Sequence, residues 1–371
     1  MGGDTRSVQM RGEYLYTAAG PDGFRVYDIA NIANKGFSER IVTSPVSPLG
    51  QDTHVSTTDA TGVALPTNMP VAPFKEQLPD NKETPLHPIY HYAFVSDRVE
   101  GLIVVNVDTL QDGEPRNNFL KRELTWNEDG VLTGARFITL AGARAFIGTD
   151  DRVVVLDLDD PLSPKVEASW PANKPTAVAI QFRYAFMTDS SGFQVIDITD
   201  TKAPRAVSDA SIKLDDARNV DVARTYCYVA AGRDGVVIID VEKPESPKEY
   251  ARYTDNGLIN DTYDIKVAST NASLFGYVAD GKNGLVVLQL TDPERVPGFY
   301  GFSPQVKPVV IARKQTAGPA LSISKPLDRD RAVDETGNQV SVFGRLGSRP
   351  FNLEEMRKMF LTERGKVWTV E

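Results

Sequence analysis

Three features of this 371-residue sequence predict an all-β chain built as a β-propeller. First, a unit made of an aromatic-rich strand, a polar turn and a β-branched run recurs along the chain. Second, equivalent aromatics of the unit, Phe146, Phe186, Tyr228 and Tyr277, lie 40, 42 and 49 residues apart, the length of one four-stranded blade. Third, the segments between units are too short and too rich in proline for the helices of an α/β fold. We expect seven blades, with six as the alternative.

Each copy of the unit predicts the two middle strands of a blade, because two apolar runs flank a turn rich in Gly, Asp and Asn. Runs such as Val236–Ile239 are continuously apolar, as expected where neighbouring blades cover both faces of a sheet. The clear copies are Tyr14–Asp28, Tyr92–Asn106, Ala145–Asp157, Tyr184–Asp197, Tyr226–Asp240 and Phe275–Gln289, and a degenerate seventh is Ala332–Phe343.

Short segments of alternating polarity precede several of these hairpins and predict the innermost strand of each blade. After each hairpin, a polar link that contains proline leads to the outer strand. Proline has no backbone N–H to donate, and the edge of a sheet tolerates it because no neighbouring strand needs that donor. The predicted innermost strands are Ala177–Ile180, Asn219–Val222, Asp264–Val267 and Leu321–Ser324.

The repeat predicts a single propeller domain over residues 1–371 with two departures from it. Residues 45–87 form a proline-rich insertion between the first two blades, and long loops of this kind often carry function. Residues 352–360 predict a short helix near the C-terminus, because Asn352 and Glu355 resemble a capping box before an apolar stripe.

Charge and composition exclude several classes of function. A formal net charge of -9 opposes binding to phosphate backbones, so we expect no nucleic-acid partner. No stretch approaches 18 consecutive apolar residues, and the given chain shows no signal peptide, so we expect no direct insertion into a membrane. The single cysteine, Cys227, excludes intramolecular disulfides, C-x-x-C zinc sites and covalent haem attachment, and we expect it to be packed as a small hydrophobe.

Three strand segments resemble the LVIVD repeat: Gly101–Val107, Gly235–Val241 and Gly284–Leu290. This resemblance extends from about Gly12 to Phe343. It implies a β-propeller like those of a family of bacterial and archaeal extracytoplasmic or surface proteins. Some members of that family are predicted to accompany multihaem cytochromes. No shared enzymatic activity defines the family. The resemblance therefore implies adhesion, scaffolding or partner binding, and an extracytoplasmic location in the periplasm or at the cell surface.

Five charged residues on or beside the predicted innermost strands are the candidates for lining a central channel, where propeller enzymes commonly place their site. Alternation along a strand decides which of them face inward, and a register slip of one residue reverses the choice. Fixed ion pairs are the alternative role. The candidates are Arg136, Arg218, Asp221, Asp264 and Lys266.

Two groups of side chains are candidates for metal ligands. The oxygen ligands Asp328, Asp330, Asp334 and Glu335 are dense enough for calcium, although a solvated salt-bridge cluster with the interleaved arginines is the alternative. The three histidines, His54, His87 and His91, lie in or beside the insertion, where surface histidines are the alternative. We expect no cofactor beyond a candidate calcium ion.

The expected function is a non-catalytic binding or scaffold module for a protein or cell-surface partner, reached through its loops and the insertion at 45–87. The alternative is a propeller hydrolase or lactonase-like metal-dependent enzyme with its site at the central channel. A docking module for a cytochrome or another envelope complex is a third possibility, and it predicts no haem bound to this chain.

Overall fold

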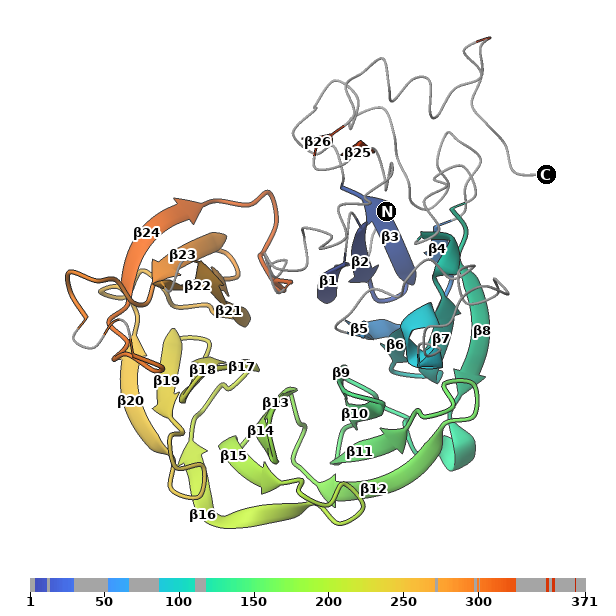
Figure 1. Cartoon of the computed structure of the whole chain (residues 1–371), viewed down its shortest axis with the longest axis horizontal. Coiled ribbons are helices and arrows are strands. Elements are labelled where there is room, and N and C mark those ends of the chain that lie inside the picture. The colour runs from blue at the N-terminus through green and yellow to red at the C-terminus, as the bar shows by residue number, and fades with distance from the viewer. Residues whose placement is uncertain are drawn as a thin grey trace, which may run out of the picture. The chain divides into compact units, whose positions relative to one another are not determined.

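The prediction of an all-β propeller fold is confirmed. The computed structural model describes residues 4–11, 14–29, 53–66, 87–110, 118–270, 273–296, 299, 301–324, 345–346, 349–350 and 364. Within these residues lie six four-stranded antiparallel sheets, each with its strands hydrogen-bonded in chain order (Figure 1). We number these blades 1 to 6 along the chain.

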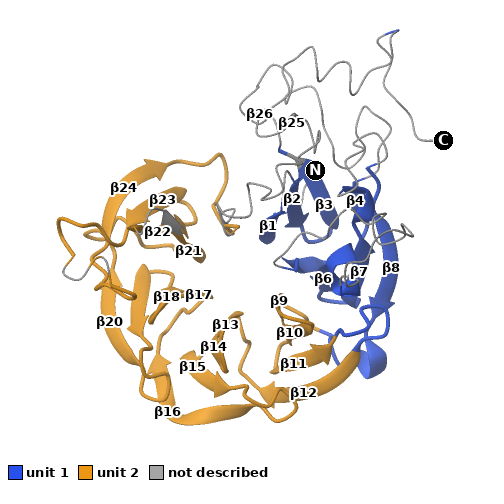
Figure 2. Ribbon diagram, in the orientation of Figure 1, with its two compact units in different colours: residues 1–133, 158–164, 326–371 blue, residues 134–157, 165–325 orange. Residues whose placement is uncertain are grey.

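The chain divides into two compact units (Figure 2). Unit 1 comprises residues 1–133, 158–164 and 326–371, and unit 2 comprises residues 134–157 and 165–325. Blades 1 and 2 belong to unit 1, and blades 3 to 6 belong to unit 2. Each unit is described below by itself.

Unit 1 contains two blades and the three short 3-10 helices of the described residues. The strands of blade 1 are β1 (Ser7–Arg11), β2 (Tyr14–Ala18), β3 (Phe24–Asp28) and β4 (His54–Val55). The strands of blade 2 are β5 (Ala60–Ala64), β6 (Tyr92–Asp97), β7 (Gly101–Asn106) and β8 (Lys121–Trp126). The helices are η2 (Pro88–His91), η3 (Asp108–Leu110) and η5 (Glu128–Gly130), and the two-stranded pair β25 (Arg345–Leu346) and β26 (Arg349–Pro350) also falls in this unit.

Unit 2 contains four blades. Blade 3 has β9 (Phe137–Ala141), β10 (Arg144–Gly148), β11 (Arg152–Asp157) and β12 (Lys165–Pro171). Blade 4 has β13 (Ala177–Gln181), β14 (Tyr184–Asp189), β15 (Gly192–Asp197) and β16 (Arg205–Lys213). Blade 5 has β17 (Asn219–Ala223), β18 (Tyr226–Ala230), β19 (Val236–Asp240) and β20 (Lys248–Tyr253), and blade 6 has β21 (Asp264–Thr270), β22 (Ser273–Ala279), β23 (Leu285–Gln289) and β24 (Val309–Lys314).

The core of unit 2 consists of apolar layers between successive blades. One layer joins blade 4 to blade 5 and contains Phe186, Phe193, Val237 and the fully buried Cys227. The layer between blades 5 and 6 contains Tyr228, Ile238 and the facing side chains of blade 6. Because the sheets of blades 4 and 5 are covered on both faces, their middle strands are apolar at successive positions, which is the pattern that the sequence shows. Cys227 is packed as predicted.

A β-bulge recurs at one position in blades 2 to 6. In blades 2 to 6 the pairing of the third strand with the outer strand shifts register just after equivalent residues. These residues are Val104, Val155, Gln194 to Ile196, Ile238 and Val287. A bulge bends the strand and increases its local twist.

Several predicted segments can be placed against these sheets. Six of the predicted hairpins are the middle strands of the six blades, whereas the seventh copy at 332–343 and the helix at 352–360 lie outside the described residues. Within the predicted insertion at 45–87, residues 54–55 and 60–64 are strands β4 and β5 of blades 1 and 2. The predicted inner strand Leu321–Ser324 pairs with no second strand in the described part of the chain. Whether the chain is a single domain stays a prediction.

Candidate functional site

The innermost strand of each blade is the edge of its sheet, so alternate backbone N–H groups of that strand point away from the ladder and need acceptors. In unit 2 the predicted site residues supply them. Asp221, the third residue of β17, accepts a hydrogen bond from the backbone N–H of Val267 on β21 at 2.8 Å. Asp264, at the start of β21, accepts one from the N–H of Ile323, also at 2.8 Å. Both carboxylates are almost fully buried.

Unit 1 uses the same arrangement without charged residues. Ser7 on β1 accepts the backbone N–H of Val63 on β5 at 3.3 Å, and Gln9 accepts the N–H of Leu65 at 3.0 Å. A hydroxyl and an amide therefore do in unit 1 what two carboxylates do in unit 2. The shared task is to satisfy the edge of the next inner strand.

Lys266 on β21 places a positive charge between the two carboxylates. Its Nζ lies 2.7 Å from Oδ1 of Asp264 and 3.4 Å from Oδ1 of Asn219. Burial lowers the pKa of this amine, but the carboxylates of Asp264 and Asp221 outweigh it, and the net pKa is raised. An amine with a raised pKa stays protonated at neutral pH, which suits Lys266 to the role of a counter-ion for these carboxylates.

Arg218 stands just before β17 and is held on three sides. Its guanidinium binds both carboxylate oxygens of Asp216, at 3.0 and 2.7 Å, and reaches Oδ1 of Asp261 at 3.3 Å. The guanidinium carbon also lies 4.1 Å from the centre of the Tyr263 ring, which is a cation–π geometry. Although burial lowers the pKa of Arg218, its carboxylate partners raise it overall.

Arg136 occupies the equivalent position in blade 3. The backbone N–H groups of Arg136 and Arg218 bond the carbonyls of Gly148 and Ala230 at the same place in their hairpins. Arg136 pairs with Asp150 at 3.0 Å and donates from Nε to the carbonyl of Pro175, just before the inner strand of blade 4. These arginines therefore tie the start of one inner strand to the start of the next.

The structure thus brings together four of the five predicted residues, Arg218, Asp221, Asp264 and Lys266, along β17 and β21, and places Arg136 two blades away. Each of the five has partners that hold the backbone or neutralise a charge. That they line a channel stays a prediction. The alternation along the strands correctly placed Asp221 and Asp264 on inner strands.

The structure does not bring together those predicted metal ligands that lie in the described residues. Asp328, Asp330, Asp334 and Glu335 lie outside the described residues. The histidines have separate partners: His54 Nε2 lies 3.0 Å from the carbonyl of Asp22, His87 Nδ1 accepts the N–H of Ile89, and His91 Nδ1 lies 2.7 Å from Asp108. No cluster of three His, Cys, Asp or Glu side chains suited to a metal occurs in the described part of the chain, and no helix there is long and apolar enough to cross a membrane.

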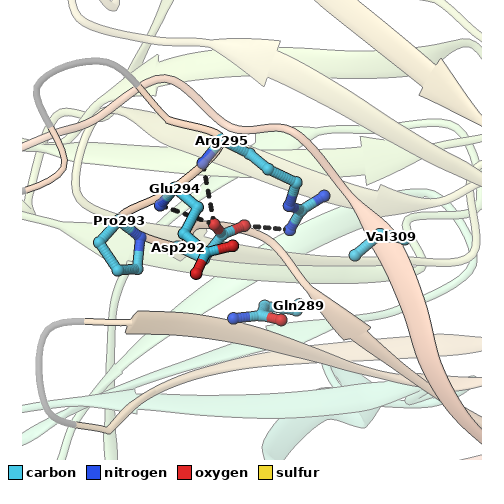
Figure 3. A pocket seen from close by; sticks show the side chains of 6 residues that line it. All are labelled: Gln289, Asp292, Pro293, Glu294, Arg295 and Val309. Carbon is cyan, nitrogen blue, oxygen red and sulfur yellow. Dashed lines mark hydrogen bonds and ion pairs between the residues drawn. The ribbon is translucent and has the colours of Figure 1, made fainter.

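A shallow open depression of about 400 Å³ lies beside blade 6 (Figure 3). Of its two acidic residues, Asp292 accepts the backbone N–H groups of Glu294 and Arg295 and pairs with the Arg295 guanidinium. Although burial raises the pKa of Asp292, these bonds lower it overall. The carboxylate therefore shapes its own loop.

The other end of the inner strands carries a residue that the sequence did not single out. Two-residue turns join the first and second strands of blades 3, 4 and 5, and their first residues, Gly142, Phe182 and Arg224, have φ of 56°, 53° and 58°. A bulky side chain in this left-handed region is strained, yet the Phe182 side chain is 90% exposed. Aligning the three turns in the sequence would have revealed an aromatic residue at a position that suits glycine.

A second exposed phenyl lies on the same end of unit 2. Phe302, 78% exposed, stands in the loop between β23 and β24. Its neighbour Ser303 shares a 2.5 Å hydroxyl contact with Thr225, in the turn of blade 5 next to the Phe182 turn. Two exposed phenyl groups therefore come from loops at the same end of unit 2, on either side of the blade 5 turn. We call the following residues the turn surface: Phe182, Arg183, Arg224, Thr225 and Phe302.

Comparisons with known proteins agree with the repeat and the fold. The family model of the LVIVD repeat matches residues 2–43, 215–255 and 273–293. A protein from Lactobacillus plantarum has a crystal structure that aligns with a TM-score of 0.57 at 11% identity, covering 86% of each chain. A protein from Bacteroides uniformis ATCC 8492, provisionally named a 6-phosphogluconolactonase, aligns with a TM-score of 0.51 at 9% identity, covering 82% of this chain and 78% of that one. Likeness at such identities is a likeness of fold. No curated protein matches the sequence.

Proposed function

Since the LVIVD-repeat model matches three segments of this chain and the described residues form four-stranded propeller blades, we propose that the protein is a non-catalytic binding module that recognises a protein partner through the turn surface. The observation that carries the proposal is Phe182. A left-handed backbone costs a non-glycine residue about 1 to 3 kcal/mol. Because the Phe182 side chain is exposed, its burial within the chain does not offset that cost. Burial of the phenyl ring against a partner would offset the cost of the strained backbone.

The charges on the turn surface indicate the chemistry of that partner. Arg183 is more than half exposed and is held by Glu245 at 3.2 Å. Arg224 stands in the turn of blade 5, at the same end of unit 2. Guanidinium groups pair well with carboxylates. The surface therefore suits a partner segment that combines apolar and acidic side chains, a surface type that is common at protein interfaces.

A photo-crosslinking experiment in the native cells tests this proposal. The photoreactive amino acid p-benzoylphenylalanine replaces Phe182 or Phe302, and the matched control replaces Phe119, a phenyl of unit 1 that is 48% exposed. We expect one discrete adduct from positions 182 and 302 that is absent at 119. Adducts of equal yield from all three positions, or none from 182 and 302, would contradict the proposal.

The family resemblance supports an extracytoplasmic location, which we include in the proposal. A cytochrome or another envelope complex is then the class of partner to examine among the adducts. Cell fractionation with antibodies to the native protein tests the location. Recovery of the protein with the cytoplasmic fraction would overturn this part of the proposal.

The alternative, a lactonase-like metal-dependent hydrolase, is supported by likeness to a fold that also serves a protein named as a lactonase. It predicts hydrolysis of sugar lactones that depends on an added divalent cation. Turnover by the purified protein that stops when the cation is chelated and returns when it is added back would favour the enzyme over the binding module.

A further inference from the structure

The loop between the outer strand of blade 5 and the inner strand of blade 6 contains an exposed Asn-Gly pair. Asp255, Asn256 and Gly257 have φ of 46°, 57° and 86°, so three successive residues have a positive φ. Glycine adopts such a backbone freely, whereas other residues rarely do. Asn256 and Gly257 are exposed, and a Cβ placed on Gly257 would meet open space. Both residues are therefore accessible to water and hydroxide.

The same three residue types recur in a protected setting. The sequence Asn-Gly-Leu of residues 256–258 is repeated at residues 283–285, in the turn between β22 and β23. There the side-chain amide of Asn283 donates to Oδ1 of Asn260 at 3.0 Å and to Oδ2 of Asp280 at 2.8 Å. One local sequence therefore stands in two different environments of the same unit.

The two glycine amides are held in similar ways, so the asparagine side chains make the difference. The N–H of Gly257 donates to the carbonyl of Thr254 at 3.0 Å and lies 3.3 Å from its hydroxyl, and the N–H of Gly284 donates to the carbonyl of Gly281 at 3.1 Å. The side chain of Asn256 has no hydrogen-bond partner among the described residues. Its amide is therefore free to turn towards the following backbone nitrogen.

We propose that Asn256 is a site of spontaneous deamidation in the folded protein and that Asn283 is protected from the same reaction. A base in the solvent removes the proton from the backbone nitrogen of Gly257, and this nitrogen forms a bond to Cγ of Asn256. The Cγ–Nδ2 bond breaks, and the amide nitrogen takes up a proton and leaves as ammonia. Water then opens the resulting succinimide at either carbonyl, which gives aspartate or isoaspartate. Asparagine is among the thermolabile residues, and glycine leaves the attack unhindered because it has no Cβ.

Deamidation changes a turn that ties blade 5 to blade 6. Before Asn256, Asp255 binds the guanidinium of Arg313 on β24 at 2.5 Å, and after it the carbonyl of Gly257 accepts Nδ2 of Asn260 at 2.7 Å. Isoaspartate adds a methylene to the backbone between these two contacts, and either product adds a negative charge next to Asp255. We therefore expect the modification to loosen the turn. This inference is independent of the proposed function, because the turn surface lies at the other end of the inner strands.

Peptide mapping by mass spectrometry tests the proposal on the full chain incubated at mildly alkaline pH. In the native protein, we expect the peptide that contains Asn256 to gain the mass of an amide-to-acid conversion at least about tenfold faster than the peptide that contains Asn283, because reaction at Asn283 requires local opening. In protein unfolded by urea, the two peptides should react at similar rates, since their local sequences are alike. Equal rates in the native protein, or a slower reaction at Asn256, would overturn the proposal.

The variant Asn256→Gln tests the consequence for the turn. Glutamine closes the ring less readily, so this variant should lose the modification at position 256 and leave the slow reaction at Asn283 unchanged. Backbone hydrogen exchange of residues 254–260 should become faster in aged wild-type protein and stay constant in the aged variant. Unchanged exchange in wild-type protein that carries the modification would overturn the predicted loosening.

Discussion

The two ends of the inner strands in unit 2 use their side chains differently. At the end where these strands begin, Arg136 and Arg218 are held by carboxylates and backbone carbonyls, and Asp221 and Asp264 on the strands accept backbone N–H groups of the segment that follows. At the other end, Phe182 stands in a strained turn with no cover. The difference teaches that a charged cluster on inner strands is architecture here, and that an apolar side chain out of place is the better guide to a binding surface.

The largest effect should come from removing the counter-ion of the cluster. Lys266→Met leaves Asp264 and Asp221 buried without a cation, and breaking a buried pair costs about 3 to 5 kcal/mol. Because the pKa of Lys266 is raised, its contribution is fully present below its unfolded pKa and is lost as the pH rises through the folded value. Thermal melts from pH 7 to the alkaline limb should therefore show the two proteins converging, and Lys266→Met with Asp264→Asn should recover part of the loss. An unchanged melting temperature would mean that the cluster is not structural.

Glycines at the two ends should also differ. Gly235, with φ of 67°, follows the hairpin turn at the beginning end, and a Cβ there would lie 2.4 Å from the carbonyl oxygen of Tyr253. Gly142, in a turn at the other end, has φ of 56° and open space around it. We expect Gly235→Ala to cost at least about 2 kcal/mol and Gly142→Ala about 1 kcal/mol, as measured by urea unfolding. Equal costs would remove this contrast.

Relieving the strained turn should stabilise the protein. Phe182→Gly removes an exposed phenyl from a left-handed backbone, and we expect a gain of about 1 kcal/mol in the free energy of unfolding together with loss of the partner adduct. A loss of stability would show that Phe182 is held by contacts within the chain and would weaken the proposed interface.

The smallest effect should come from an exposed ion pair on the outer strand of blade 5. Arg252 bonds Glu249 at 2.8 and 2.9 Å and lowers the pKa of that carboxyl. Both side chains are exposed, so Arg252→Ala should cost below about 1 kcal/mol at neutral pH. The cost is present above the unfolded pKa of Glu249 and disappears as the pH falls through the lowered value. Thermal melts of the two proteins at acidic pH or at high salt check this prediction. A difference in melting temperature that persists under those conditions would contradict it.

The fold could be predicted because its signals are local. The run Val236–Ile239 and the Gly235 turn lie within a few residues of each other, and each copy repeats them. The site could be predicted only in part, because its contacts join residues far apart in the sequence. Alternation identified Asp221 and Asp264, but their acceptor bonds join residues 46 and 59 positions apart, and only the packing of one blade on the next shows that these carboxylates satisfy backbone donors. The role proposed for Phe182 depends on its left-handed backbone conformation. The sequence gives no sign of that conformation, because phenylalanine rarely adopts it.

The recurrent bulge on the outer strands has a consequence for how the molecule behaves in concentrated solution. A straight outer strand would offer neighbouring molecules a flat row of N–H and C=O groups on which to add strands. The register shifts at Val104, Val155, Ile238 and Val287 break that row in each of their blades. We expect the protein to resist fibril formation by edge-to-edge pairing at these blades, since a bulged outer strand departs from the flat geometry that amyloid growth requires.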